Sequence, residues 1–363
     1  MLLFVYTFIS LVSIIFVSRR KITLQLWKII VIAFSIRVIV LLLFINSRSD
    51  DINTFLRDGQ YLIDRDPRYD ASYFPFVSYL GMAALYFKHF IDPYLFLKII
   101  FIILDVAIVS PLFFLAKKNS QSAFIYALNP ITIIVAVVHG QIDSIPMFLL
   151  LLGILLFVRK KIISSVLVLS WAIYVKTWPL LFVVPIFKRA KNKLLFIFLP
   201  LIPTILTLIH SLIFPQTFLS IFLKVKNHLG IPGEWGIGKI FLNPRMVHLL
   251  SRFFIFIFAI FAFLRKDKDM LKEILIIMLF FFVFTPTFGI QWIAWLVPFI
   301  LLVRPKMWIF FLIIASVYVT LGFVWDADSY FHTIMPIWTN IIAGAGFVTW
   351  IFITYLFFAI IDI

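Results

Sequence analysis

The chain has 363 residues, of which 64% are hydrophobic, with 45 phenylalanines and a mean hydropathy of +1.12. A soluble core of this size cannot bury so many apolar side chains, so the composition excludes a soluble domain and indicates a polytopic membrane protein. The net charge of +16 lies in short basic clusters between apolar runs, which is typical of membrane topology signals, and we predict no nucleic-acid partner.

The apolar runs have about the length of membrane-crossing helices and lack the short alternating segments of a β-barrel. We therefore predict an all-α, polytopic transmembrane helical bundle, a single integral-membrane domain over residues 1–363. About 13 spans are expected, near residues 2–17, 24–45, 94–116, 121–138, 144–158, 162–175, 177–187, 194–214, 240–264, 273–288, 290–303, 306–325 and 334–360. The first run lacks the basic start and the cleavage site of a signal peptide, so we count it as a span.

The basic clusters predict the orientation of these spans. When alternate connections face the cytoplasm, that side receives each basic cluster between spans, as the positive-inside rule requires. The other side receives the acidic segment 46–72, the turn 139–143 and the segment 215–238. This topology requires that residues 73–90 lie at the outer surface. We expect a multi-pass protein of the cell membrane with its active site on the non-cytoplasmic face.

The first large outer loop, residues 46–93, is the predicted catalytic loop with surface helices. Its first part, residues 46–72, holds six of the sixteen acidic residues of the chain, namely Asp50, Asp51, Asp58, Asp64, Asp66 and Asp70. A helix over residues 52–63 would gather Ile52, Phe55, Leu56, Leu62 and Ile63 on one face, with Arg57 and Asp58 away from it. This spacing predicts an interfacial helix, and Asp51 at its start is either a reactive carboxylate or a helix cap.

A polar turn, His139-Gly140-Gln141-Ile142-Asp143-Ser144, joins two apolar runs. A histidine, an amide and a carboxylate at a membrane boundary can bind a hydroxylated ligand or tune a proton transfer. The alternative is a solvated hairpin in which Asp143 and Ser144 cap the next helix. One histidine and one aspartate are too few ligands for a metal site. The absence of cysteine also excludes thiolate catalysis and thiolate metal sites.

Lys176 lies near a predicted outer boundary, where a lysine can neutralise a lipid phosphate or extend to the membrane interface. Tryptophans near this boundary and in a later outer turn beside Gln291 are either site residues or ordinary interface residues, namely Trp178, Trp292 and Trp295. Within the spans, Arg37 and Asp105 can pair inside the bundle.

The long outer segment 215–238 is interrupted by prolines and glycines, and it is a candidate substrate cover. Arg245 follows it near the outer end of a predicted span. Its side chain can either help to form an anion pocket or contact lipid headgroups.

The order of these segments resembles a known family. The runs DDINTFLRDGQYLIDRDPRY and SYFPFVSYL resemble the first outer loop of GT-C membrane glycosyltransferases, and NPITIIVAVVHGQIDSIPMFLLLLGILLF, KTWPLLFVVPIF and FGIQWIAWLVPF resemble later segments of that family. The resemblance covers most of residues 24–303. It is closest to polyprenyl-phosphate-sugar-dependent mannosyltransferases of the phosphatidylinositol-glycan and phosphatidylinositol mannoside types. The Asp-x-Asp of the family stands here as Asp51-Ile52-Asn53, and its Pro-Pro as Phe74-Pro75.

The resemblance implies transfer of a hexose, with mannose favoured, from a polyprenyl-phosphate carrier to a hydroxyl of a lipid or glycan acceptor, with inversion. The residues that it implies are Asp51, Asp50 and His139 for catalysis, Asn53, Gln141, Asp143, Trp178 and Gln291 for substrate binding, and Lys176 and Arg245 for the donor phosphate. Membrane lipids are the other expected partners. No cofactor is expected, and a divalent metal is not favoured because Asn53 replaces the second carboxylate.

Two other classes of function suit parts of the sequence. A transporter or flippase of a lipid-linked sugar also needs many helices with buried charges. The carboxylates gather at one face and the chain has no convincing internal repeat, which favours the enzyme. A membrane scaffold that binds a partner through its outer loops is the third class, and a substrate-sized cavity bordered by Asp51 and His139 would argue against it.

Overall fold

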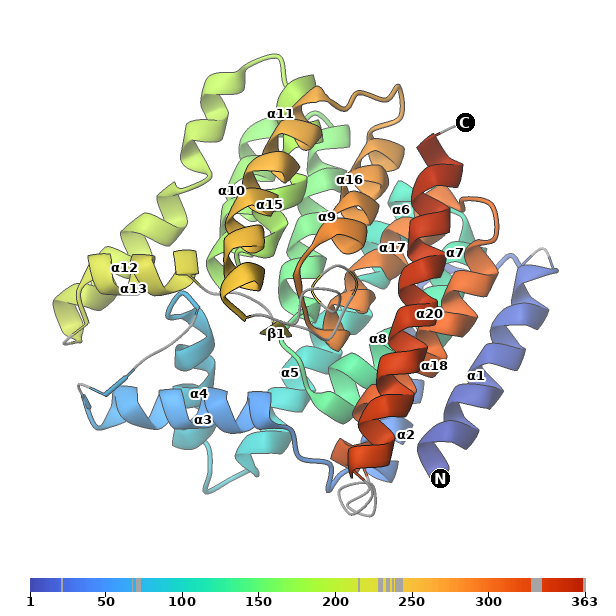
Figure 1. Ribbon diagram of the computed structural model, residues 1–363. Helices are drawn as coiled ribbons and strands as arrows, with labels where there is room; N and C mark the ends of the chain where they lie inside the picture. Colours follow the sequence, from blue (N-terminus) through green and yellow to red (C-terminus); the bar gives the residue numbers. More distant parts are fainter. Residues whose placement is uncertain are drawn as a thin grey trace.

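The computed structural model describes the chain except residues 21, 67, 70–72, 215, 228–230, 233–235, 237, 239–243, 328–334 and 362–363. The described part is all-α apart from one two-residue strand pair (Figure 1), as predicted. The first elements are α1 (Leu2–Ser18), α2 (Leu26–Leu43), α3 (Asp50–Ile63), α4 (Phe76–Tyr86), α5 (Pro93–Ala107), α6 (Val109–Leu115), α7 (Ser120–Leu128), α8 (Pro130–Ile133), the π-helix η1 (Ile134–His139), α9 (Ser144–Val158) and α10 (Ile162–Val175).

The second half continues with shorter helices before the last long ones. Its elements are η2 (Trp178–Phe182), α11 (Val184–Arg189), η3 (Lys193–Phe198), α12 (Leu201–Ile213), α13 (Phe218–Asn227), α15 (Pro244–Leu264), α16 (Met270–Phe284), η4 (Ile290–Trp292), α17 (Ile293–Val303), α18 (Trp308–Ala327) and α20 (Met335–Ile361). The strands β1 (Ile231–Pro232) and β2 (Thr287–Phe288) pair in antiparallel orientation.

In the described residues, five helices are long and apolar enough to cross a membrane, or six spans if the bent pair α7 and α8–η1 counts as one. The prediction of about 13 spans is therefore not confirmed. Several predicted spans are shorter helices, such as the 15-residue α9, and 15 residues rise only about 22 Å against a hydrocarbon layer of about 30 Å. Hydropathy does not distinguish a membrane-crossing helix from a helix buried inside the bundle, because a helix packed on all sides is as apolar as one that faces lipid.

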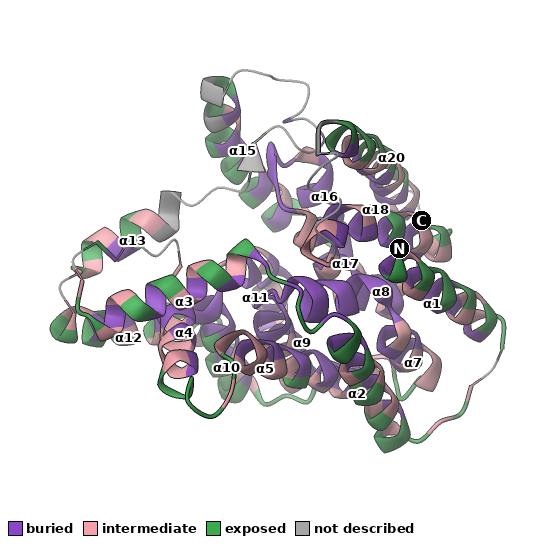
Figure 2. Ribbon diagram, turned by 90° about the horizontal axis from the view of Figure 1, so that it is seen from below, coloured by how far each residue is buried: buried purple, intermediate pink, exposed green. Residues whose placement is uncertain are grey.

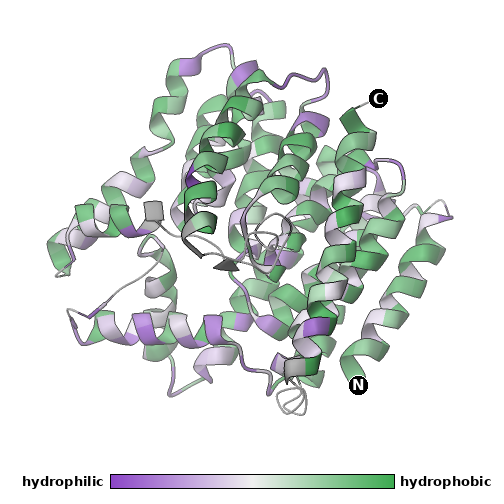
Figure 3. Ribbon diagram, viewed as in Figure 1, coloured by the Kyte–Doolittle hydropathy of each residue, from purple (hydrophilic) through white to green (hydrophobic). Residues whose placement is uncertain are grey.

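The middle of the bundle is the most deeply buried part. The helices α8, α16 and α17 are buried along most of their length, whereas α1, α2 and α20 expose apolar side chains on their outer faces (Figure 2). Hydrophobic residues cover the bundle helices, and hydrophilic ones concentrate in the connections and along α3 (Figure 3). Outer faces of this kind suit a lipid environment, because their side chains are apolar and the backbone polar groups of a helix are hydrogen-bonded within the helix.

The predicted ion pair between Arg37 and Asp105 is confirmed inside the bundle. Nε of Arg37 donates to Oδ2 of Asp105 at 2.6 Å, and the hydroxyl of Tyr126 donates to Oδ1 at 2.6 Å. Nη1 of Arg37 also donates to the carbonyls of Ala33 and Ala127 at 3.1 Å. A buried charge needs such partners, so this network joins α2, α5 and α7.

Helix α3 lies across the direction of the long bundle helices and packs against α4 (Figure 1). Ser49 caps it by accepting the N–H of Ile52 at 3.3 Å. Its apolar face, which includes Ile52 and Phe55, is covered by α4 and α5, where the sequence predicted contact with the membrane. Asp58 is also buried on this face, contrary to expectation, because three residues after Phe55 the helix returns to the same side.

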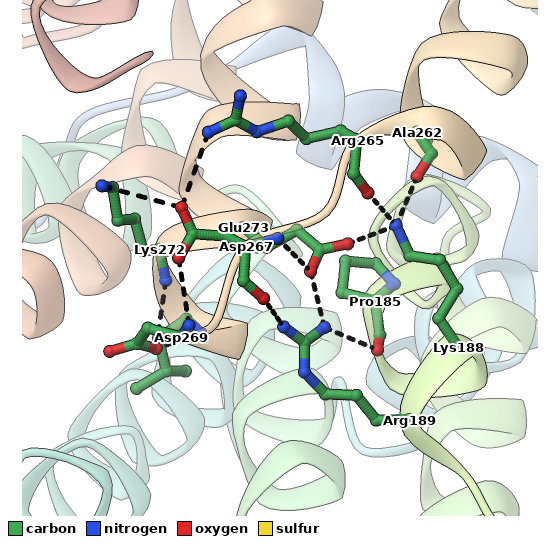
Figure 4. Close-up of polar contacts among 10 residues, drawn as sticks. Pro185, Lys188, Arg189, Ala262, Arg265, Asp267, Asp269, Lys272 and Glu273 are labelled. Atoms are coloured by element: carbon green, nitrogen blue, oxygen red, sulfur yellow. Dashed lines mark hydrogen bonds and ion pairs between the residues drawn. The ribbon is translucent and has the colours of Figure 1, made fainter. Parts of the chain in front are cut away.

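At the opposite end of the bundle, a buried carboxylate joins three helices (Figure 4). Glu273 is 1% exposed, and Nη1 of Arg189 lies 2.6 Å from its Oε2 while Nζ of Lys188 contacts its Oε1. Nζ of Lys188 also donates to the carbonyls of Ala262 and Arg265 at the end of α15. Through these bonds α11, the end of α15 and the start of α16 are held together.

We expect Glu273→Gln to lower the free energy of unfolding by about 3–5 kcal/mol, because it leaves two cations without their buried partner. Tryptophan fluorescence during unfolding in mixed micelles measures the change. Lys268→Gln is the matched control, since Lys268 is exposed in the same connection and its loss should change the free energy by less than about 0.5 kcal/mol. Equal effects of the two variants would contradict a structural role of Glu273.

Candidate functional site

The carboxylate of Asp51 meets two side chains of the polar turn at the start of α3. Nε2 of His139 lies 2.9 Å from Oδ2 of Asp51, and Nε2 of Gln141 donates to the same oxygen. The other end of the Gln141 amide accepts the N–H of Ile142 at 2.9 Å, which fixes its orientation. Oδ1 of Asp51 has no hydrogen bond to a described residue, and the side chain is 37% exposed. One carboxylate oxygen is therefore held and the other is accessible.

The polar turn reaches Asp51 because its second residue is glycine. Gly140 has φ +77°, a conformation that other residues rarely adopt. A Cβ at this position would lie 2.4 Å from Cδ1 of Ile52 in α3. The N–H of Gln141 donates to the carbonyl of Val135 at 2.9 Å, which closes the turn on η1. A larger residue at position 140 would push the turn away from α3.

A buried lysine holds both partners of this contact in place. Nζ of Lys98 donates to Oγ and the carbonyl of Ser47 at 2.6 and 3.0 Å, and to the carbonyl of Val138 at 3.2 Å. Ser47 precedes α3 and Val138 precedes His139. Lys98 on α5 thus ties the two segments that carry Asp51 and His139. Lys98 lies within the apolar run 94–116, which was predicted as a span.

A second polar group lies at the other end of the turn. Nζ of Lys176 is 3.0 Å from Oδ2 of Asp143, and Nε1 of Trp178 donates to Oδ1 at 3.1 Å. Trp178 stacks on Trp295 with ring centroids 4.3 Å apart. Because these four residues are buried, Lys176 does not extend to the interface and Trp178 and Trp295 are not interface residues. The side chain of Asp143 makes no capping bond to α9 either.

The electrostatics of Asp51 and Lys176 keep both groups charged at neutral pH. Burial raises the pKa of Asp51, but the hydrogen bond and charge of His139, the charge of Lys176 and the bond from Gln141 together hold it below its usual value. Burial lowers the pKa of Lys176, but Asp143 above all raises it beyond its usual value.

A cavity of about 710 Å³ opens beside Lys176. Its walls are mostly apolar, and Lys176 is the charged residue among the described residues that line it. Phe218 and Phe222 of α13 line it too, so the described part of the predicted cover segment borders this cavity. An apolar space whose described lining includes a lysine suits an amphiphile that carries an anionic group.

The cavity and the Asp51 carboxylate are neighbouring but separate features. Asp51 and His139 are not among the described residues that line the cavity. Tyr73 lines it, with Nζ of Lys176 5.4 Å from its ring centroid. The charge of Lys176 also lowers the pKa of Asp51. Lys176 is therefore the residue that the wall of the cavity and the surroundings of Asp51 have in common.

The structure brings together six of the predicted site residues in two groups, Asp51 with His139 and Gln141, and Asp143 with Lys176 and Trp178. Three others stay apart. Asp50 and Asn53 are exposed, and their side chains, like that of Gln291, form no hydrogen bond or ion pair with a described residue. The side chain of Arg245 lies outside the described residues.

Two residues of α18 complete the surroundings of His139 and were not selected from the sequence. Oδ2 of Asp326 lies 2.7 Å from Nδ1 of His139. The ring of Phe323 stacks on the imidazole, with the two ring centroids 4.2 Å apart. The one sequence signal was the place of Asp326 at the end of an apolar run, in a predicted outer connection.

Among the residues that the structure describes, no group of three or more histidine, aspartate and glutamate side chains is arranged to hold a metal ion. No protein-family model, curated protein or solved structure matches the chain. The function is therefore inferred from the chemistry of the site.

Proposed function

We propose that the chain is a membrane glycosyltransferase that moves a hexose, with mannose favoured, from a polyprenyl-phosphate carrier to a hydroxyl of a lipid or glycan acceptor. The observation that carries this proposal is the Asp51 carboxylate, held through one oxygen by His139 and Gln141 and accessible at the other. The apolar cavity bordered by Lys176 lies beside it. A positioned base and a space for a lipid phosphate are the two features that this transfer requires.

The reaction is a single displacement at C1 of the donor sugar. The acceptor oxygen forms a bond to C1, while the bond from C1 to the phosphate oxygen breaks and its electron pair leaves with the polyprenyl phosphate. Oδ1 of Asp51 takes the hydroxyl proton as the acceptor attacks. Because the acceptor attacks opposite the leaving group, the configuration at C1 is inverted.

Lys176 is the residue that this proposal assigns to the donor phosphate. Its ammonium group has three N–H donors and lines the cavity beside the ring of Tyr73. Charge on the departing phosphate is stabilised best by a cation that is already fixed in place, and Asp143 fixes Lys176. A phosphomonoester leaves with less charge than a nucleotide diphosphate, so the proposal needs no metal.

The proposal places the protein in the cell membrane with Asp51 on the non-cytoplasmic face. The basic clusters between apolar runs support this orientation. Helix α11, which carries Lys188 and Arg189, lies at the end of the bundle opposite to α3, and the same rule assigns that end to the cytoplasm (Figure 1). Membrane lipids surround the bundle, and the acceptor reaches Asp51 from the outer surface.

Purified protein in liposomes, supplied with labelled polyprenyl-phosphate mannose and candidate lipid acceptors, tests the proposal. We expect label to appear in a glycosylated lipid, and a nucleotide-diphosphate mannose in place of the donor to give no product. Movement of intact labelled donor across the bilayer without a new glycosidic bond would indicate a transporter instead. Neither product nor transport with any acceptor would contradict both functions.

The pH dependence of transfer follows from the lowered pKa of Asp51. A base is active above its pKa, and the pKa of Asp51 lies below the ordinary value of about 3.9. We therefore expect kcat/KM for the donor to show no acid limb between about pH 5 and 8. In His139→Leu the hydrogen bond and the charge of His139 are lost while burial still raises the pKa of Asp51, so an acid limb should enter this range. An acid limb in the unmodified protein would contradict the assignment.

A further inference from the structure

Helix α18 presents two side chains and one carbonyl to the site. Asp326 meets Nδ1 of His139 at 2.7 Å, and Phe323, one turn earlier, covers a face of the same ring. The carbonyl of Asp326 accepts the N–H of Arg48 at 3.3 Å, just before α3. The end of α18 is thus joined to the segment that carries Asp51 as well as to His139.

The imidazole of His139 lies between two carboxylates. Oδ2 of Asp326 faces Nδ1 and Oδ2 of Asp51 faces Nε2. An ionised carboxylate only accepts hydrogen bonds, and a neutral imidazole has a hydrogen on one nitrogen alone. Both contacts are therefore satisfied, with both carboxylates ionised, when the ring carries a hydrogen on each nitrogen.

Two lysines on separate elements lie near this trio, and one of them, Lys176, also pairs with Asp143. Lys98 of α5 interacts with Asp326, and Lys176, which follows α10, interacts with Asp51. Each carboxylate thus has a second positive neighbour, which lowers the cost of keeping two ionised carboxylates close together. Gln141 adds a neutral donor to Asp51.

We infer that Asp326 is a positioning residue for Asp51. It holds His139 in the imidazolium form, whose Nε2–H together with Gln141 occupies Oδ2 of Asp51 and leaves Oδ1 to receive the acceptor proton. This inference rests on the proposed function, in which Asp51 is the base. Without Asp326, a neutral ring has one hydrogen to place on either Nδ1 or Nε2, so the Nε2–H that orients the Asp51 carboxylate is present only in one tautomer.

The protonation of the ring can be measured without any activity. Magic-angle-spinning NMR of the full-length protein with ¹⁵N-labelled histidine in liposomes distinguishes singly from doubly protonated rings, and His139→Gln identifies the signal. We expect both nitrogens of His139 to be protonated at about pH 8, where an ordinary imidazole is mostly neutral, and Asp326→Asn to give a singly protonated ring. A singly protonated ring in the unmodified protein, or no change in Asp326→Asn, would overturn the inference.

The kinetics of Asp326→Asn give a second readout. We expect kcat at neutral pH to fall about 10- to 100-fold with KM for the donor changed by less than about threefold. Activity of this variant should rise as the pH falls through the titration of the imidazole, at about pH 6.5, because protonation restores the Nε2–H. The unmodified protein should show no such rise.

Thr320→Val is the control for a purely structural effect of α18. Its hydroxyl lies 2.8 Å from that of Thr7, so the variant removes a hydrogen bond of α18 without removing a partner of His139. It should leave the His139 signal and the pH profile unchanged, and a change equal to that of Asp326→Asn would assign Asp326 a structural role. If neither the unmodified protein nor any variant transfers sugar, the proposed function fails. The NMR result still decides how Asp326 acts on His139.

Discussion

Asp51→Asn is expected to lower the rate of sugar transfer by about 10²- to 10⁴-fold, the range for loss of a general base. The side-chain oxygen of asparagine can still accept the bonds from His139 and Gln141 at the position of Oδ2. The accessible oxygen is replaced by an amide nitrogen, which cannot take a proton. The fold and the affinity for the donor should therefore be preserved, as measured by unfolding in mixed micelles and by binding of the labelled donor.

Asp64→Asn is the matched control, because Asp64 ends the same helix and is exposed. It should change the rate by less than about twofold. Asp50→Asn in the same assay decides whether the neighbouring carboxylate assists, since the structure gives Asp50 no hydrogen bond or ion pair with a described residue. Full transfer by a folded Asp51→Asn protein would remove Asp51 from the role of base.

The second large effect is expected at Lys176. Lys176→Met alone leaves the buried carboxylate of Asp143 without its cation, which should destabilise the protein by about 3–5 kcal/mol. The double variant Lys176→Met, Asp143→Asn removes both charges and should fold. Its KM for the polyprenyl-phosphate donor should rise about 10- to 100-fold, because a hydrogen bond to a charged group contributes about 1.5–3 kcal/mol.

Lys176→Arg keeps the positive charge beside Asp143 and serves as the conservative control. It should retain more of the donor affinity than the double variant does, because the attraction to phosphate depends first on charge. Binding of the labelled donor to liposomes that contain each variant measures both effects. An unchanged donor affinity in the folded double variant would exclude Lys176 as the phosphate-binding residue.

Local sequence patterns were sufficient for the class of fold and for part of the site. The apolar composition and the absence of alternating segments predicted an all-α membrane protein, and the described part is all-α apart from one short strand pair, with helices able to cross a membrane. The turn from His139 to Asp143 was recognisable because its polar residues stand between two apolar runs. Both ends of that turn do take part in polar contacts.

The number of spans was not predictable in the same way. Hydropathy measures how apolar a segment is, and helices such as α9 are apolar because other helices cover them. The amphipathic face of α3 posed a similar problem, since a face that packs on α4 has the same pattern as one that lies on lipid. In both cases the hydrophobic pattern indicates that the face contacts an apolar surface. It does not show whether that surface is another helix or lipid.

The sequence by itself determined the helical class, the presence of helices apolar enough to cross a membrane and the chemical types available for a site, because these follow from composition and from periodicity over short distances. Only the tertiary structure decided that Asp51 is held by the distant His139, that Asp143 binds Lys176 instead of capping α9, and that Asp326 completes the trio. The physical reason is that a hydrogen bond depends on two atoms about 3 Å apart. Asp51 at the start of α3 and Asp326 near the end of α18 approach the same imidazole at the end of η1, and local periodicity does not contain that distance.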